Sequence, residues 1–181
     1  MRQWFALSAI GRDRPGIVAD LAEVIYQCDG NLEDSSMTAL GSEFAVLLLL
    51  SGTGPDFPTR LSTACKHLEW EKRLTVFLRP IDGDPARLGM PGGRGFECTI
   101  TGVDRAGIVA RVARVLADLG VSVTDLRTES RRVAESGTPL YTMRIRMLAP
   151  RAVGEAELKR GLDPVAVALR VELSLVTLPG E

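Results

Sequence analysis

The chain of 181 residues contains one 24-residue pattern twice, at 11–34 and again at 102–125. Aligned without a gap at an offset of 91, the two segments share ten identical residues. The identities include the loop pattern G-x-D-R-x-G-I-V. Two unrelated amphipathic helices would not share this loop, because such helices agree only at their apolar positions. We therefore interpret the chain as two copies of a module of roughly 85 residues, each large enough to bury its own core.

Apolar periodicity predicts the same order of elements in both copies, with period two in the strands and helical spacing in the segments between them. The expected order is βαββαβ, the ferredoxin-like arrangement. In copy one it comprises a strand at 4–10, a helix over 17–28, strands at 31–39 and 43–50, a helix from 58 and a strand at 74–80. In copy two it comprises a strand at 96–101, a helix over 108–119, strands near 122–130 and 141–147, a helix from 155 and a strand at 171–178.

The sequence thus predicts an α+β protein of two tandem ferredoxin-like domains, each an antiparallel sheet with helices on one face. The expected domains are 1–81 and 96–181, joined by a linker at 82–95 that contains five Gly and two Pro. The third strand of copy two follows a longer loop, near 131–139.

Two local features make sharper predictions. Pro164 is expected to interrupt the last helix, which would restart with Asp163 as its N-cap. The run FAVLLLL at 44–50 is apolar on both faces, and a strand of this kind must be covered twice. The outer face of the first sheet is therefore expected to pack on the other copy or on another chain, although a local loop would also cover it.

Composition argues against several classes of function. The formal net charge is −1, so no strong basic field supports nucleic-acid binding. The three cysteines lack C-x-x-C spacing and sit at apolar-periodic positions, so we expect buried thiols and no metal site. His67 is the single histidine, no familiar enzyme motif is present, and we expect no catalytic residues and no cofactor. No secretory signal or apolar run of 18 residues occurs, so a cytoplasmic protein is expected.

The repeated strand-to-helix loop is the place where a ligand is expected. Asp13 and Asp104 are candidate N-caps, and Pro15 suits a first helical turn. Residues 14–17 would present unpaired amide N–H groups, Gly16 would let a ligand approach the backbone, and the helix dipole would favour a carboxylate. Asp13 would attract an ammonium group, and Asn31, expected beside this loop, offers a donor and an acceptor. A purely structural interpretation stays open, in which Asp13 caps the helix and Gly16 permits close packing.

The loops D-R-P-G-I-V and D-R-A-G-I-V, each between a strand and a helix, resemble those of the ACT domain. The stretch 7–52, with G-x-D-R-P-G-I-V, N-L-E-D-S and L-G-x-E-F, is similar to the glycine cleavage system transcriptional repressor family. This resemblance implies amino-acid-responsive regulation through a partner regulator, with glycine the natural candidate ligand. It also implies ligand binding at a domain–domain interface, near the first loop and the start of the second strand. The residues to which it maps in copy one are Gly11, Asp13, Arg14, Pro15, Gly16, Ile17 and Asn31.

Copy two departs from this pattern, because Ala106 replaces the proline and Ser122 replaces the asparagine. A weaker second site is expected there, comprising Asp104, Arg105, Ala106, Gly107, Ile108 and Ser122. Our hypothesis is a non-enzymatic sensor of a small amino acid. It would control genes of glycine cleavage or amino-acid metabolism through a partner transcription regulator, and it would be a homodimer. The alternatives are a ligand-independent dimerisation or interaction module and the regulatory subunit of a metabolic enzyme.

Overall fold

The computed structural model describes residues 2–83, 85, 93–132 and 139–179. The chain divides into two compact units, Met1–Gly89 and Met90–Glu181. Most of the predicted linker lies outside the described residues, as does the central part, 133–138, of the loop predicted near 131–139. The first strand of the second unit begins at Arg94, within the segment predicted as linker.

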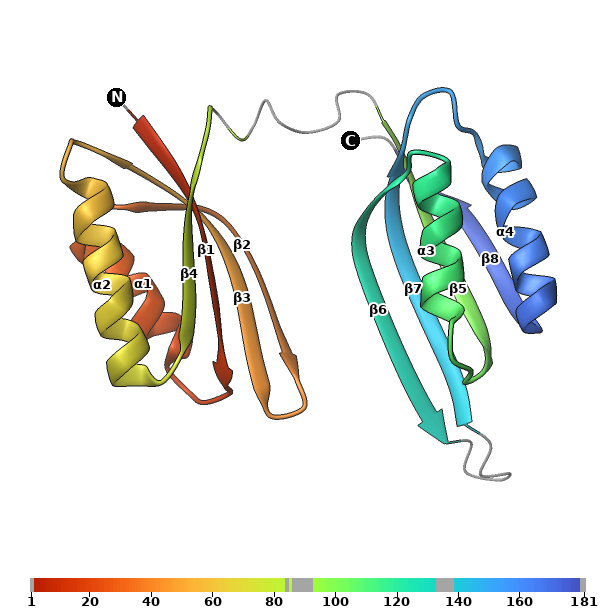
Figure 1. Cartoon of the computed structure of the whole chain (residues 1–181), viewed down its shortest axis with the longest axis horizontal. Helices are drawn as coiled ribbons and strands as arrows, with labels where there is room; N and C mark the ends of the chain where they lie inside the picture. Colours follow the sequence, from red (N-terminus) through yellow and green to blue (C-terminus); the bar gives the residue numbers. More distant parts are fainter. Residues whose placement is uncertain (1, 84, 86–92, 133–138, 180–181) are drawn as a thin grey trace. The chain divides into compact units, whose positions relative to one another are not determined.

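The first unit contains four strands and two helices in the predicted order. They are β1 (Arg2–Arg12), α1 (Ile17–Gln27), β2 (Asn31–Leu40), β3 (Glu43–Thr53), α2 (Phe57–Lys72) and β4 (Thr75–Ile81). The strands form one antiparallel sheet in the order β2-β3-β1-β4, and both helices cover one face of it (Figure 1). This arrangement confirms the ferredoxin-like fold predicted from periodicity.

The second unit repeats the first. Its elements are β5 (Arg94–Val103), α3 (Ile108–Asp118), β6 (Ser122–Arg132), β7 (Pro139–Ala149), α4 (Glu155–Leu169) and β8 (Val171–Thr177). The sheet order is β6-β7-β5-β8, which is the first unit's order shifted by four strands. Both β2 and β6 contain a register shift near their starts, at Leu32/Asp34 and Val123/Asp125, so even this irregularity is duplicated.

Each core lies between the helices and the inner face of its sheet. In the first unit, alternate residues of β1 (Phe5, Leu7 and Ala9) face the α1 residues Ile17 and Leu21 and are buried. The outer face of the same sheet is different, since Leu47 remains 56% exposed and Phe77 remains 72% exposed. The helices therefore cover only one side of the strand that is apolar on both sides.

The three cysteines are free and buried, as their apolar periodicity predicted. Burial raises the pKa of Cys65 and that of Cys98 to about 11. Such thiols behave as small apolar side chains and not as nucleophiles or ligands.

The prediction that Pro164 interrupts the last helix is wrong. Helix α4 is continuous from Glu155 to Leu169, with Pro164 inside it. The apolar stripe Leu158, Leu162, Ala166 and Leu169 is buried on both sides of the proline. Burial of this stripe offsets the roughly 3 kcal/mol that an interior proline costs. Pro164 itself is exposed, so the backbone carbonyl it leaves unpaired can face water.

We expect Pro164→Ala to stabilise the chain by about 1–3 kcal/mol, because it restores a helical hydrogen bond and relieves the ring clash. Asp163→Ala is the matched control, and it should change the free energy of unfolding by less than about 0.5 kcal/mol, since Asp163 caps no helix in this structure. Urea denaturation followed by circular dichroism measures both. A loss of about 1 kcal/mol in Asp163→Ala would instead support the broken helix that the sequence suggested.

Candidate functional site

The entrance to helix α1 has a different cap from the one predicted. Gly16, not Asp13, is the N-cap residue, and it has a left-handed backbone with φ 90°. The side chain of Asp13 makes no capping hydrogen bond, and its backbone N–H instead donates to the carbonyl of Ser42 at 2.8 Å. Pro15 also precedes the helix instead of opening it. This hydrogen bond ties the loop to the β2–β3 turn. The N-cap is therefore Gly16, three residues after the predicted N-cap Asp13.

Glycine is needed at this cap for its backbone conformation. A Cβ atom on Gly16 would meet only Arg14 Nη1, at 4.0 Å, so close packing does not explain the glycine. The φ of 90° explains the glycine, since residues with an L side chain rarely adopt that value. The space beside the first helical N–H groups is therefore open, which is the geometry that an approaching ligand requires.

Gly11 has the opposite role. A Cβ atom there would lie 2.5 Å from Leu74 Cδ2, so this glycine permits the close approach of β1 and the start of β4. Ile17 is likewise a core residue, 2% exposed, and only its backbone N–H can face the entrance. Among the predicted residues of the loop, Asp13, Arg14, Pro15 and Gly16 are the ones exposed at the helix entrance.

Arg14 folds back over the first turn of α1. Its Nη2 donates to Asp20 Oδ2 at 2.7 Å, and Lys72 Nζ lies 3.4 Å from the other oxygen of this carboxylate. The hydrogen bond from Arg14 is the largest cause of the lowered pKa of Asp20. Two cations thus lie beside the N-terminal end of the helix, where the helix dipole also favours an anion.

Asn31 is not beside this loop, contrary to the sequence prediction. Gly11 pairs with Phe44 at one end of the sheet, whereas Asn31 pairs with Ser51 at the other end. Helix α1 spans the distance between them, about 16 Å for 11 residues at 1.5 Å per residue. The first loop and Asn31 of one unit therefore cannot hold the same small ligand.

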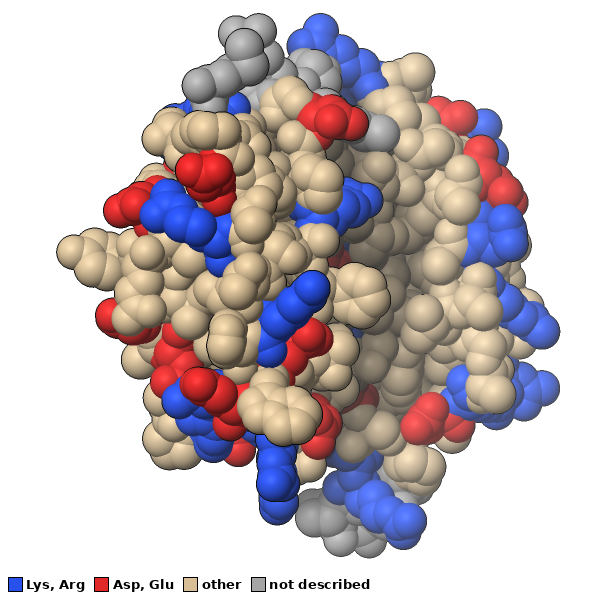
Figure 2. Space-filling view, turned by 60° about the vertical axis from the view of Figure 1, so that its left-hand side comes forward, with Lys and Arg blue, Asp and Glu red and all other residues tan. Residues whose placement is uncertain are grey.

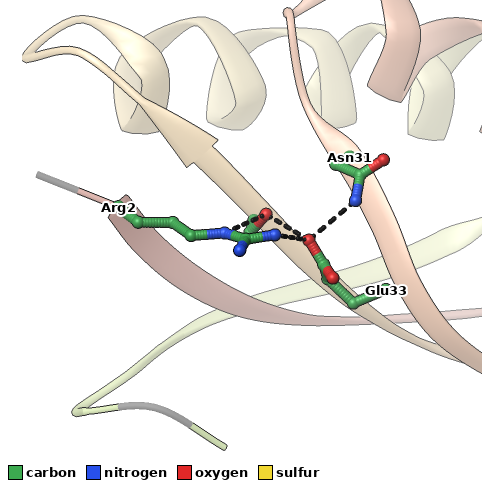
Figure 3. Close-up of polar contacts among 4 residues, drawn as sticks. Arg2, Asn31 and Glu33 are labelled. Atoms are coloured by element: carbon green, nitrogen blue, oxygen red, sulfur yellow. Dashed lines mark hydrogen bonds and ion pairs between the residues drawn. The ribbon is translucent and has the colours of Figure 1, made fainter.

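Asn31 belongs instead to a polar cluster around the carboxylate of Glu33 (Figure 3). Asn31 Nδ2 donates to Glu33 Oε1 at 2.7 Å, the hydroxyl of Ser51 donates to the same oxygen at 2.5 Å, and Arg2 Nη2 forms an ion pair with it. Arg2 Nε also donates to Ser51 Oγ at 3.0 Å. The bond from Ser51 is the largest cause of the lowered pKa of Glu33, followed by that from Asn31.

The second unit reproduces the helix entrance but not its charges. Gly107 is the N-cap with φ 94°, and nothing lies within 4 Å of a Cβ atom placed there. However, Arg111 occupies the position of Asp20, so the carboxylate that holds Arg14 in the first unit has no counterpart. The Glu33 cluster is missing as well, since sheet register puts Leu148 at the place of Ser51 and Thr124 at that of Glu33.

Metal binding and membrane crossing can each be checked against the described residues. No group of three or more His, Cys, Asp or Glu side chains in the described ranges could hold a metal ion. Within the same ranges, no helix combines the length and apolar character needed to cross a membrane. On the face drawn in Figure 2, acidic and basic side chains are interspersed and no broad area has a single sign.

Comparison with known proteins identifies the family of the first unit. A family model described as ACT domain matches residues 3–78. These residues are an ACT domain. The second ACT-like unit follows from the structure, whose elements and sheet order repeat those of the first.

A curated relative matches part of the chain, and two solved structures match nearly all of it. The glycine cleavage system transcriptional repressor of Escherichia coli (strain K12) is 40% identical over 52 residues, which are 29% of this chain and 27% of that protein. An unknown protein from Galdieria sulphuraria matches 99% of this chain and 100% of its own, with a TM-score of 0.80 and 27% identity. A putative glycine cleavage system transcriptional repressor matches 99% of both chains with a TM-score of 0.76 at 21% identity, which shows the fold. The first unit is thus an ACT domain, the second unit repeats its fold, and part of the chain is similar to one of these repressors.

Sequence reasoning missed Arg2, Asp20, Glu33, Ser51 and Lys72 at the two ends of the first ACT domain. Asp20 lies in the first turn of a helix, where an acidic residue is a recognisable signal. The Glu33 cluster had no such signal, because Arg2 and Ser51 are 49 residues apart and meet only through sheet register.

We expect Gly16→Ala to destabilise the first ACT domain by about 1–2 kcal/mol, because alanine is strained at a left-handed backbone position. Gly16→Asn is the matched control, since asparagine tolerates this conformation and is a good N-cap. Chemical denaturation measures the difference between the two variants. Equal stabilities of Gly16→Ala and the native chain would show that this φ value is not required.

Glu33→Gln should lower the melting temperature at pH 7, because it removes the ion pair with Arg2 and weakens the cluster. The lowered pKa of Glu33 means that the unfolded chain binds its proton more readily than the folded chain does. Stabilisation by this carboxylate is therefore complete above its ordinary pKa of 4.5 and is lost as the pH falls below it. The melting temperatures of variant and native chain should accordingly converge between pH 7 and pH 3. Glu129→Gln, which removes an exposed ion pair with Arg131, should change little at either pH.

Proposed function

We propose that this protein is a non-enzymatic regulator that senses a small amino acid at the entrance to helix α1 of its first ACT domain. The observation that carries the proposal is the open, left-handed Gly16 at the start of that helix, beside the exposed carboxylate of Asp13. The resemblance to a glycine cleavage system transcriptional repressor supports the regulatory role.

The α-carboxylate of the ligand would bind the amide N–H groups at the start of α1. The first N–H groups of a helix have no partner within it, and the helix dipole favours a negative charge there. Arg14 and Lys72 add positive charge near the same helical turn, since both contact Asp20. Asp20 already neutralises part of that charge, so the backbone amides are the main contact and Arg14 is the secondary one.

The α-ammonium of the ligand would bind Asp13. This side chain is exposed and caps no helix, so its carboxylate is available to a positively charged group. A carboxylate and several amide donors around one opening match the two charges of a zwitterion. The proposed contacts involve only the α-carboxylate and the α-ammonium of the ligand and not its side chain. A ligand such as glycine or another small amino acid fits this pattern.

Asn31 would join this site only across an interface. Because it lies at the opposite end of the sheet, it can reach a ligand at the helix entrance only from a neighbouring molecule. Its amide already donates to Glu33, so a ligand would compete with that bond. Gly11 and Ile17 would shape the site through packing and through the Ile17 amide.

The second ACT unit would be the weaker site. Gly107 reproduces the left-handed entrance, and Asp104, Arg105, Ala106 and Ile108 surround it in sequence. Ser122, like Asn31, starts the second strand of its unit and lies at the far end of the sheet. Without a counterpart of Asp20, the arginine of this loop lacks the contact that holds Arg14.

Regulation would follow from a change in packing that a partner protein detects. We place the protein in the cytoplasm as a homodimer that controls genes of glycine cleavage or amino-acid metabolism through a partner transcription regulator. A coupling of about 1–3 kcal/mol between ligand and partner is sufficient for such control, and a few hydrogen bonds to a charged ligand supply it.

The test is calorimetric titration of the full chain with each of the twenty amino acids. We expect a small amino acid to bind, and Asp13→Ala to weaken its affinity about tenfold, which corresponds to about 1.4 kcal/mol. Asp104→Ala is the matched control in the second unit and should have a smaller effect. If none of the twenty binds, or if Asp13→Ala binds as the native chain does, the proposed site is wrong.

Asn31→Ala separates the two versions of the site. If the site is confined to the α1 entrance, the affinity of Asn31→Ala for the amino acid should be unchanged. If Asn31 of a neighbouring molecule completes the site, the affinity should fall at protein concentrations at which the two molecules associate. Circular dichroism controls for folding, because removal of one Glu33 contact leaves those from Ser51 and Arg2 in place.

A further inference from the structure

The outer face of the β2-β3-β1-β4 sheet is unusual for a surface without a partner. Its residues facing away from the helices include Ala6 and Ser8 of β1, Leu47 and Leu49 of β3, and Phe77 of β4. Leu47 is 56% exposed and Phe77 is 72% exposed. A contiguous apolar area on a sheet face is a sign of an interface.

The corresponding face of the second unit shows that the fold itself does not require apolar residues on the outer face. There, Arg144 occupies the position of Leu47, and Arg144 and Arg146 both form ion pairs with Glu97. Arg127 pairs with Asp125 on the same sheet. This face carries its own charge partners and suits water, so the apolar face of the first unit is a property of that unit alone.

Sheet register arranges the apolar face in rows that run across the four strands. One row reads Arg79, Ala6, Leu49, Asp34, and the next reads Phe77, Ser8, Leu47, Ser36. In both of these rows the small residue lies on β1 and its large neighbour lies on β3. The two flanking rows reverse this order, with Trp4 beside Ser51 and Ile10 beside Ala45. Side-chain size therefore differs between the two sides of each row. The row that contains Ala6 also has opposite charges at its two ends, Arg79 and Asp34.

We propose that this face binds the same face of a second copy of the chain, through a twofold axis parallel to the strands. Such an axis exchanges the two sides of every row while keeping the rows aligned. Leu49 of one copy then lies over Ala6 of the other, Leu47 lies over Ser8, and Phe77 lies over Ser36. Large side chains fill the spaces over small ones, which is how two packed sheets reach the density of a protein interior.

The charges at the row ends support this axis. Arg79 and Asp34 lie on opposite edges of the sheet, three strand spacings or about 14 Å apart, so they cannot pair within one copy. The proposed axis brings Arg79 of each copy to Asp34 of the other, twice in each dimer. The alternative in-plane axis, perpendicular to the strands, would put Arg79 near Arg79 and large residues over large ones.

The dimer should be of modest strength. Four strands about 4.8 Å apart and four rows about 6.8 Å apart give a planar patch of about 500 Å². This is smaller than the roughly 800 Å² per partner of a standard stable interface. We therefore expect dissociation in the micromolar range. Because the axis is parallel to the strands, both α1 entrances lie at the same end of the dimer and outside its interface.

Sedimentation equilibrium of the full chain, without amino acids, tests the interface at protein concentrations from about 1 to 200 μM. We expect the mass to rise from 19.5 kDa towards twice that value. Leu47→Glu should raise the dissociation constant at least about a hundredfold, because two charges would be buried in each dimer. Arg144→Glu, at the same position of the second unit, is the matched control and should leave the dissociation constant unchanged.

Charge exchange tests the axis itself. Arg79→Asp alone and Asp34→Arg alone should each raise the dissociation constant about tenfold, through like charges facing each other. The double variant should return to within about threefold of the native chain, because both pairs re-form with reversed sign. All of these positions are on the exposed face, so circular dichroism should show folded variants.

Two results would overturn this interface. One is a native chain that stays monomeric up to 200 μM, and the other is a dimer that Leu47→Glu and the charge exchanges leave intact. Neither result bears on amino-acid sensing, which calorimetry measures at the α1 entrance. Failure of the dimer and failure of the sensor are therefore distinguishable.

Discussion

Each unit of this protein depends on the burial of two helices against a single face of a four-stranded sheet. Alternation along β1 and β3 supplies that face, and the helical stripes of α1 and α2 complete the core. Because the fold needs only the inner face, residues on the outer face are free to differ between the two copies. They do differ: one outer face exposes Leu47 and Phe77, and the other carries ion pairs around Glu97. The two copies thus share the arrangement of their cores but differ in the polarity of their outer faces.

The strand-to-helix loop is the second feature that both copies retain. In each unit a left-handed glycine ends the loop and starts the helix, which leaves the first amide groups open to a ligand. The charges around the entrance have not been retained in the same way, since Asp20 is replaced by Arg111. The left-handed helix entrance is therefore common to both copies, whereas the charges beside it differ. The first copy has the entrance with Arg14, Asp20 and Lys72 nearby, and it also has the sheet face on which Leu47 and Phe77 are exposed.

Local sequence patterns predicted most of the fold because helices and strands depend mainly on the spacing of apolar residues. They failed where a distant contact decided the outcome. Asp13 has the residue type and position of a cap, but its backbone N–H bonds to Ser42 and the helix starts at Gly16 instead. Pro164 has the residue type of a helix breaker, but burial of Leu162 and Ala166 on either side of it keeps α4 continuous. In both cases a tertiary contact outweighed a local preference.

The sequence by itself determined the duplication, the order of the elements, the buried cysteines and the loop in which a ligand is proposed. All of these follow from the identity and spacing of residues close together in the chain. Only the tertiary structure decided that Asn31 lies at the far end of the sheet from that loop, in a cluster with Glu33, Ser51 and Arg2. It also decided which residues share a row of the outer face. Strand register controls both, and register joins residues tens of positions apart, so no local pattern contains it.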